Sequence, residues 1–140
     1  MNRTLLVILA GCIIGAVRDP VQAQAGGIKL SDVAGTWVGK SMVGPKDSVL
    51  STWVLTATAD GKGWTFKRPN GDPYPVRIVA VGGDSIVTEV GPYPSVLRAG
   101  ETVTTRFVGH YHGRKMTGTF EAHYPSGDVV KGKLAATRRK

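Results

Sequence analysis

The side chains of this chain best suited to chemistry are its histidines. His110 and His112 stand two residues apart, and on a β-strand this spacing points both imidazoles to one face, where they could chelate a metal ion. His123 falls several residues away along the predicted sheet, so a third ligand is missing. We therefore predict no metal site and interpret the pair as solvent-exposed histidines.

The acidic residues do not suggest a hydrolase. Glu89 and Glu121 each face an arginine in the predicted strand pairing, whereas glycoside hydrolysis needs two carboxylates that flank one bond. Ser126-Gly127-Asp128 and the histidines lack the arrangement of a catalytic triad, and the glycine-rich turns lack the strand-and-helix context of a phosphate loop. We expect no enzyme, no catalytic residue and no cofactor.

Length and charge bound the class of protein. The 140 residues suit one domain, and a charged fraction of 20% is typical neither of a disordered nor of an integral membrane protein. The formal net charge is +8, which draws a protein to anionic lipids or polysaccharides. Because the basic residues are scattered, with Arg138-Arg139-Lys140 as the one cluster, they favour a solvated surface, and we expect no nucleic-acid partner.

The first 25 residues are predicted to be a signal peptide. Arg3 gives a positive start, an apolar run follows over residues 5–17, and Ala23-Gln24-Ala25 is a small-x-small cleavage site. An alternative is a lipoprotein box ending at Cys12, but the apolar run continues past that cysteine. We expect an exported protein, periplasmic or secreted, whose single domain spans residues 26–140. Removal of Arg3, Arg18 and Asp19 would lower the net charge to +7.

The rest of the chain reads as short strands joined by turns. The alternation of apolar and polar residues predicts strands over 35–42, 48–58, 74–81, 85–90, 102–112 and 115–124, with a short strand around 64–68 and a last one after 128. Gly91-Pro92-Tyr93-Pro94 is expected to leave the ladder, and residues 95–97 to form a short extra strand. No helix of useful length is predicted.

The predicted strand registers agree with one another. Pairing Leu55 with Phe66, Arg77 with Glu89, and Phe107 with Phe120 places apolar side chains on one face of each hairpin. The second of these pairings also sets Ala80 opposite Ile86. For the last hairpin the expected register puts Phe120 against Leu134. A meander of about eight strands must hide its edges, so we predict an all-β fold: an antiparallel up-and-down meander closed into a barrel. A Greek-key sandwich is the alternative.

Gly35-Thr36-Trp37 resembles the G-x-W motif of the lipocalins and the wider calycin superfamily. The resemblance implies that Trp37, with Gly35 beside it, packs across the closed end of the barrel, and that a basic residue of the last strand lies over the indole. Arg138 is the best match for that residue, and the contact would be a cation–π interaction. The second lipocalin motif is absent, and no biotin-binding set follows Trp37.

The inward-facing aromatic residues are the candidate ligand site. They could line a small apolar pocket, or they could fill the barrel, since eight strands enclose little space. The candidates are Trp53, Trp64, Phe66, Phe107, Tyr111, Phe120 and Tyr124. We predict a non-enzymatic binding protein that holds a small hydrophobic or amphipathic ligand in the barrel. The alternative is a filled barrel that engages anionic lipid or polysaccharide through its basic surface.

Overall fold

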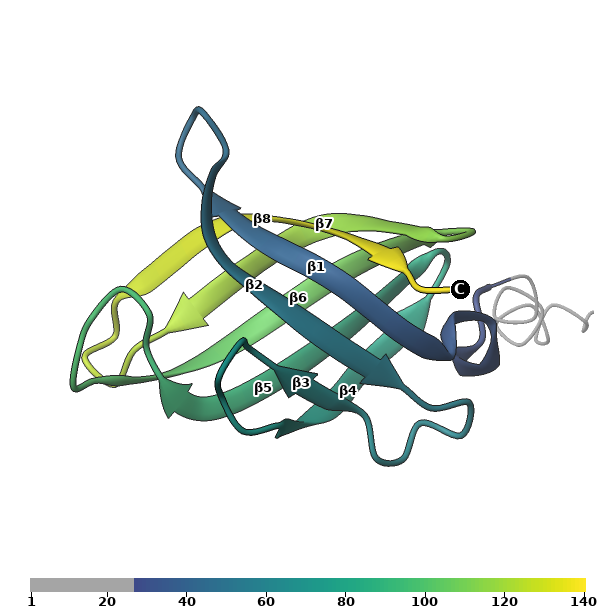
Figure 1. Ribbon diagram of the computed structural model, residues 1–140. Coiled ribbons are helices and arrows are strands. Elements are labelled where there is room, and N and C mark those ends of the chain that lie inside the picture. Colours follow the sequence, from purple (N-terminus) through teal and green to yellow (C-terminus); the bar gives the residue numbers. More distant parts are fainter. Residues whose placement is uncertain (1–26) are drawn as a thin grey trace, which may run out of the picture.

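Eight antiparallel strands close into a barrel in sequence order, each hydrogen-bonded to the next and β8 to β1 (Figure 1). The computed structural model describes residues 27–140; the predicted signal peptide, the cleavage at Ala25 and the alternative at Cys12 lie outside the described residues. The predicted all-β, up-and-down barrel is confirmed. The strands are β1 Gly35–Val43, β2 Ser48–Ala57, β3 Thr65–Lys67, β4 Tyr74–Gly82, β5 Ser85–Pro94, β6 Thr102–His112, β7 Lys115–His123 and β8 Val129–Arg138.

The up-and-down order gives the barrel two distinct ends. One end holds the short 3₁₀ helix η2 (Leu30–Val33), the start of β1, the β6–β7 turn and the C-terminus (Figure 1). We call it the closed end. The other, which we call the open end, holds the β1–β2, β3–β4, β5–β6 and β7–β8 connections. No helix among residues 27–140 is long and apolar enough to cross a membrane.

Strand alternation decides which residues form the core. Burial alternates along β6 from Val103 to Tyr111, so every second side chain points into the barrel. A glycine often stands where an inward aromatic ring needs room: a Cβ at Gly39 would collide with the indole of Trp53, and one at Gly132 with the ring of Phe120. On the inner surface, each of these two large rings therefore occupies the space beside a glycine of the neighbouring strand.

The predicted registers hold in three hairpins and fail in one. Leu55 lies opposite Phe66, Arg77 opposite Glu89, and Phe107 opposite Phe120. In the β7–β8 hairpin, however, Phe120 lies opposite Gly132, two residues from the expected Leu134. A two-residue slip keeps every side chain on its face, so the hydrophobic pattern does not distinguish the two registers.

Bulges account for the other departures from the expected strands. Val79 is an extra residue in β4, so Ala80 lies opposite Val87 and not Ile86. The expectation that Gly91-Pro92-Tyr93-Pro94 leaves the ladder is wrong: a second irregularity lets β5 continue, with Tyr93 opposite Val103. The predicted extra strand at 95–97 is also wrong, because those residues belong to the β5–β6 loop.

Candidate functional site

Aromatic rings fill most of the barrel interior. Phe107 lies at the centre, with ring centroids 5.4 Å from Phe66, 6.2 Å from Trp53 and 6.5 Å from Phe120. These separations are those of packed aromatic pairs. Two small cavities remain between the rings and the barrel wall, of about 40 Å³ towards the open end and about 20 Å³ towards the closed end. The barrel is therefore filled in this conformation.

The closed end is sealed by Trp37. Its side chain is fully buried, its indole N–H donates a hydrogen bond to the carbonyl of Val33 (2.9 Å), and Tyr111 packs edge-on against it at 5.1 Å. Arg138 lies over the indole, with Cζ 5.3 Å from the ring centroid. Gly35 has a φ of +134°, and a Cβ there would press on the Arg138 stem. This end is thus closed by packed side chains, and the cavity of about 20 Å³ beside it is too small for a ligand.

Arg138 is held in place by the backbone. Its guanidinium donates to the carbonyls of Asp32 (3.0 Å), Ala34 (3.1 Å) and Gly113 (3.4 Å), which belong to η2, the residue before β1 and the β6–β7 turn. The same side chain therefore joins the first and last strands and covers Trp37. Charged donors to carbonyls are among the stronger protein hydrogen bonds.

The open end contains the candidate binding site. Its cavity has aromatic walls and several hydroxyl groups. The hydroxyls of Tyr93 and Thr105 share a hydrogen bond of 2.6 Å, and Trp53 donates to the Ser41 hydroxyl at 3.0 Å. Burial raises the pKa of Tyr93, so this group stays a neutral hydroxyl. The lining comprises Ser41, Leu50, Ser51, Phe66, Arg68, Tyr93, Ser95, Val96, Leu97, Val103, Thr105, Phe107, Phe120, Ala122, Tyr124 and Val130.

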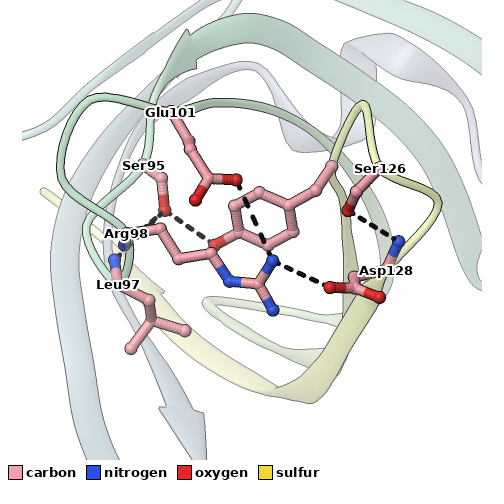
Figure 2. Close-up of polar contacts among 7 residues, drawn as sticks. Ser95, Leu97, Arg98, Glu101, Ser126 and Asp128 are labelled. Carbon is pink, nitrogen blue, oxygen red and sulfur yellow. Dashed lines mark hydrogen bonds and ion pairs between the residues drawn. The ribbon is translucent and has the colours of Figure 1, made fainter.

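The β5–β6 loop, residues 95–101, contributes Ser95, Val96 and Leu97 to that lining, and side chains attach it to the opposite β7–β8 turn. Figure 2 shows the Arg98 side chain between Glu101 of the same loop and Asp128 of the β7–β8 turn. Its Nη1 atom lies 2.9 Å from Asp128 Oδ2 and 3.9 Å from Glu101 Oε1. The Arg98 guanidinium also lies 4.2 Å from the centroid of the Tyr124 ring. The Ser95 hydroxyl bonds that of Tyr124 at 2.7 Å and accepts from two backbone N–H groups of its own loop. We call this set of contacts the latch.

Apolar side chains are exposed around the open end. Val49 is 55% exposed, Val96 51%, Leu97 48% and Val129 41%. Arg68 adds a positive charge at the same rim, with its guanidinium 4.8 Å from the Tyr93 ring and bonded to the carbonyl of Pro94 (2.8 Å). An apolar rim with cations beside aromatic walls can bind an apolar or amphipathic molecule.

Six of the seven predicted lining residues divide between the two cavities. Phe120 and Tyr124 line the open-end cavity, Trp53 and Tyr111 line the closed-end one, and Phe66 and Phe107 separate the two. Trp64 lines neither; it is buried under the loop after β2, and its indole N–H donates to the carbonyl of Thr58. The predicted set is therefore not one pocket.

Sequence reasoning missed three residues of the open end. Tyr93 was expected on a stiff loop outside the ladder and was left out of the predicted lining, yet only 7% of it is exposed, and it forms a wall of the cavity. Arg68 and Arg98 were counted among scattered basic residues, although each lies over a tyrosine ring. The closeness of Arg98 to Asp128 depends on two loops 30 residues apart in sequence, for which the sequence holds no local signal.

The histidine pair lies on the outer wall. Asp84, in the β4–β5 turn, contacts His110 Nδ1 and His112 Nε2, each at 3.0 Å. The hydrogen bond to His110 is the main reason that the pKa of Asp84 falls below its usual value. Within residues 27–140 no group of three His, Cys, Asp or Glu side chains has the geometry to hold a metal ion. Asp84 is a partner that the sequence did not reveal.

Comparison with protein-family models, curated proteins and solved structures found no match to this chain. The fold itself defines the class: an eight-stranded antiparallel meander closed into a barrel, consistent with a calycin-like architecture.

Proposed function

We propose that this protein is an exported, non-enzymatic binding protein that takes a small apolar or amphipathic molecule at the open end of its barrel. The observation that carries the proposal is the β5–β6 loop: its apolar residues Val96 and Leu97 are about half exposed, yet they line a cavity walled by aromatic rings. The G-x-W motif and the Arg138–Trp37 contact support a lipocalin-like barrel.

The size of the cavity requires the loop to move. Pockets for small ligands typically enclose roughly 300–1,000 Å³, whereas the open-end cavity has about 40 Å³. A ligand therefore enters by displacing Val96 and Leu97, and it takes over their apolar contacts with the aromatic walls. The loop is suited to this, because the latch consists of side-chain contacts and not of a strand ladder.

The composition of the rim indicates the kind of ligand. An apolar tail would pack against Phe66, Phe107 and Phe120, while a polar or anionic head would meet Arg68 and the hydroxyl of Tyr93 or Ser95. A medium-chain fatty acid has this chemistry and is a suitable probe.

The test has two parts. Organic extraction of the purified protein followed by mass spectrometry should release a bound apolar molecule, and titration with dodecanoate should shift the tryptophan emission, because Trp53 packs on Phe66. Val96→Asp, which places a charge where the tail enters, should weaken dodecanoate binding about tenfold or more. Val79→Asp, at a similarly exposed position on the wall of β4, is the matched control. If nothing is extracted and fatty acids, lipids and haem leave the emission unchanged, the proposal fails.

The small interior volume favours a second candidate function. In that case the barrel is a filled scaffold, and its basic exterior engages an anionic partner at the cell envelope. This candidate needs no movement of the β5–β6 loop. It is distinguished by binding that weakens with added salt while dodecanoate has no effect.

A further inference from the structure

The outer wall formed by β7, β8, β1, β2 and β3 carries two rows of outward side chains. The strand registers place Lys115, Thr137, Val38, Val54 and Lys67 in one row, and Thr117, Ala135, Lys40 and Thr52 in the next. These strands lie side by side in Figure 1. Neither row contains an acidic residue. The wall is thus a band of lysines and small side chains.

A shallow groove follows this band. Its larger part, about 460 Å³, is lined by small residues such as Val38 and Ala135 together with Lys40 and Lys115. A smaller hollow of about 120 Å³ continues past Val38 and Thr52 to Lys67 and Arg68. We call the two together the wall groove.

The lysines of the wall groove have no competing anions. Lys40, Lys67 and Lys115 form no ion pair with any residue in the described range 27–140. The cations of the opposite wall differ, because Arg77 and Arg106 both pair with Glu89. The positive charge of the groove is therefore not neutralised by a salt bridge to any residue of the described range.

The spacing of the lysines indicates a polymer. Lys115 and Lys67 lie in the same row, each two strands away from Lys40, which lies in the next row. The spacing of strands and residues in a sheet then places the Cα atom of Lys40 about 12 Å from that of each of the other two lysines. A single small anion can reach one of them. A linear chain with repeated anionic groups can contact all three, and the hydroxyls of the threonines can bond its neutral oxygens.

The shape of the surface argues against a membrane. A convex barrel wall touches a flat bilayer along a line only, and the groove offers no exposed aromatic side chain to anchor in the interface. We propose that the wall groove binds a linear acidic polysaccharide, with Lys40, Lys67 and Lys115 pairing with its carboxylate or sulfate groups. This inference rests on the second candidate function and does not depend on a ligand at the open end.

Dextran sulfate, with uncharged dextran of the same length as control, tests the proposal by calorimetric titration of the purified protein at low and high salt. The protein should bind dextran sulfate only, and more weakly as salt rises. The triple variant Lys40→Gln, Lys67→Gln, Lys115→Gln should bind at least tenfold more weakly. A control triple variant with the same change of charge, Lys46→Gln, Lys62→Gln, Lys131→Gln, alters exposed lysines outside the groove and should retain most of the affinity. Unfolding midpoints of both variants verify that they fold.

The possible results distinguish a wrong assignment of the groove from a failure of the second candidate function. If the unmodified protein does not bind dextran sulfate even at low salt, the groove assignment is overturned. If it also fails to bind phosphatidylglycerol vesicles, the second candidate function is overturned with it. If both triple variants lose affinity equally, net charge binds the polymer and the groove assignment alone is wrong. Tighter binding to phosphatidylglycerol vesicles than to the polysaccharide would overturn the proposal in favour of a membrane surface.

Discussion

Arginine side chains lie over aromatic rings at both ends of the barrel, and two of them, Arg138 and Arg98, are held differently. At the closed end Arg138 lies over Trp37 and bonds three backbone carbonyls. At the open end Arg98 lies over Tyr124 and pairs with the exposed carboxylates of Asp128 and Glu101. Backbone carbonyls at the closed end are fixed by the fold, whereas carboxylates on loops can exchange their partner for water.

This difference assigns a different role to each end. The closed end joins η2, β1 and β8 around a fully buried indole, so its contacts serve stability. The open end leaves Val96 and Leu97 about half exposed on a loop that side-chain contacts attach to the β7–β8 turn. We therefore expect substitutions at the closed end to change the free energy of unfolding, and those at the open end to change binding.

Trp37→Ala is the variant with the largest expected effect, and it tests whether the closed end stabilises the barrel. Removing the indole leaves a large cavity among β1, η2 and Tyr111, so the free energy of unfolding should fall by roughly 3–5 kcal/mol. Leu97→Ala, at the open end, should change it by less than about 0.5 kcal/mol. Urea unfolding followed by circular dichroism measures both. A stable Trp37→Ala variant would show that the closed end does not hold the barrel together.

Exchanging each arginine for glutamine compares the two ends directly. Arg138→Gln loses a cation–π contact and hydrogen bonds to three carbonyls, and it should cost about 2 kcal/mol in the free energy of unfolding. Arg98→Gln should cost less, because its partners are exposed to water, and it should speed hydrogen exchange in residues 95–101. Equal losses of the free energy of unfolding in the two variants would contradict the proposal that the closed end serves stability and the open end serves binding.

Much of the fold could be predicted because strand alternation is a local signal. The apolar faces of Phe107 and Phe120 identified the β6–β7 hairpin and its register. Where a slip of two residues preserves the faces, as between Phe120 and Leu134, alternation carries no information. In the observed register the Phe120 ring and the carbonyl of Met42 both lie where a Cβ of residue 132 would be, and this packing exists only in the assembled barrel.

The candidate site was less predictable than the fold. Inward aromatic residues could be recognised on strands, but whether they enclose a pocket depends on how tightly Trp53, Phe66 and Phe107 pack, and the sequence does not specify this. The partners Asp84 and Asp128 lie in turns that meet distant segments only after the barrel closes. Local patterns therefore predicted the walls of the barrel better than its rim.

The smallest effect is expected at the polar cluster of Asp84 and His110, which lies on the wall near the closed end. The hydrogen bond from His110 lowers the pKa of Asp84, so the folded state binds this proton more weakly than the unfolded chain. Asp84 therefore stabilises the fold above its unfolded pKa of about 3.9, and that contribution is lost as pH falls through the lower value of the folded state.

His110→Ala removes the main cause of that shift. Because the cluster is exposed to solvent, the variant should match the unmodified protein within about 0.5 kcal/mol at pH 7. Any difference should shrink as pH falls below about 4, through the lower folded-state pKa of Asp84. Urea unfolding at pH 7, 5 and 3 measures this, with His123→Ala on the wall near the open end as control. A large loss at pH 7 confined to His110→Ala would mean that exposed polar contacts, and not the burial of Trp37, stabilise the closed end.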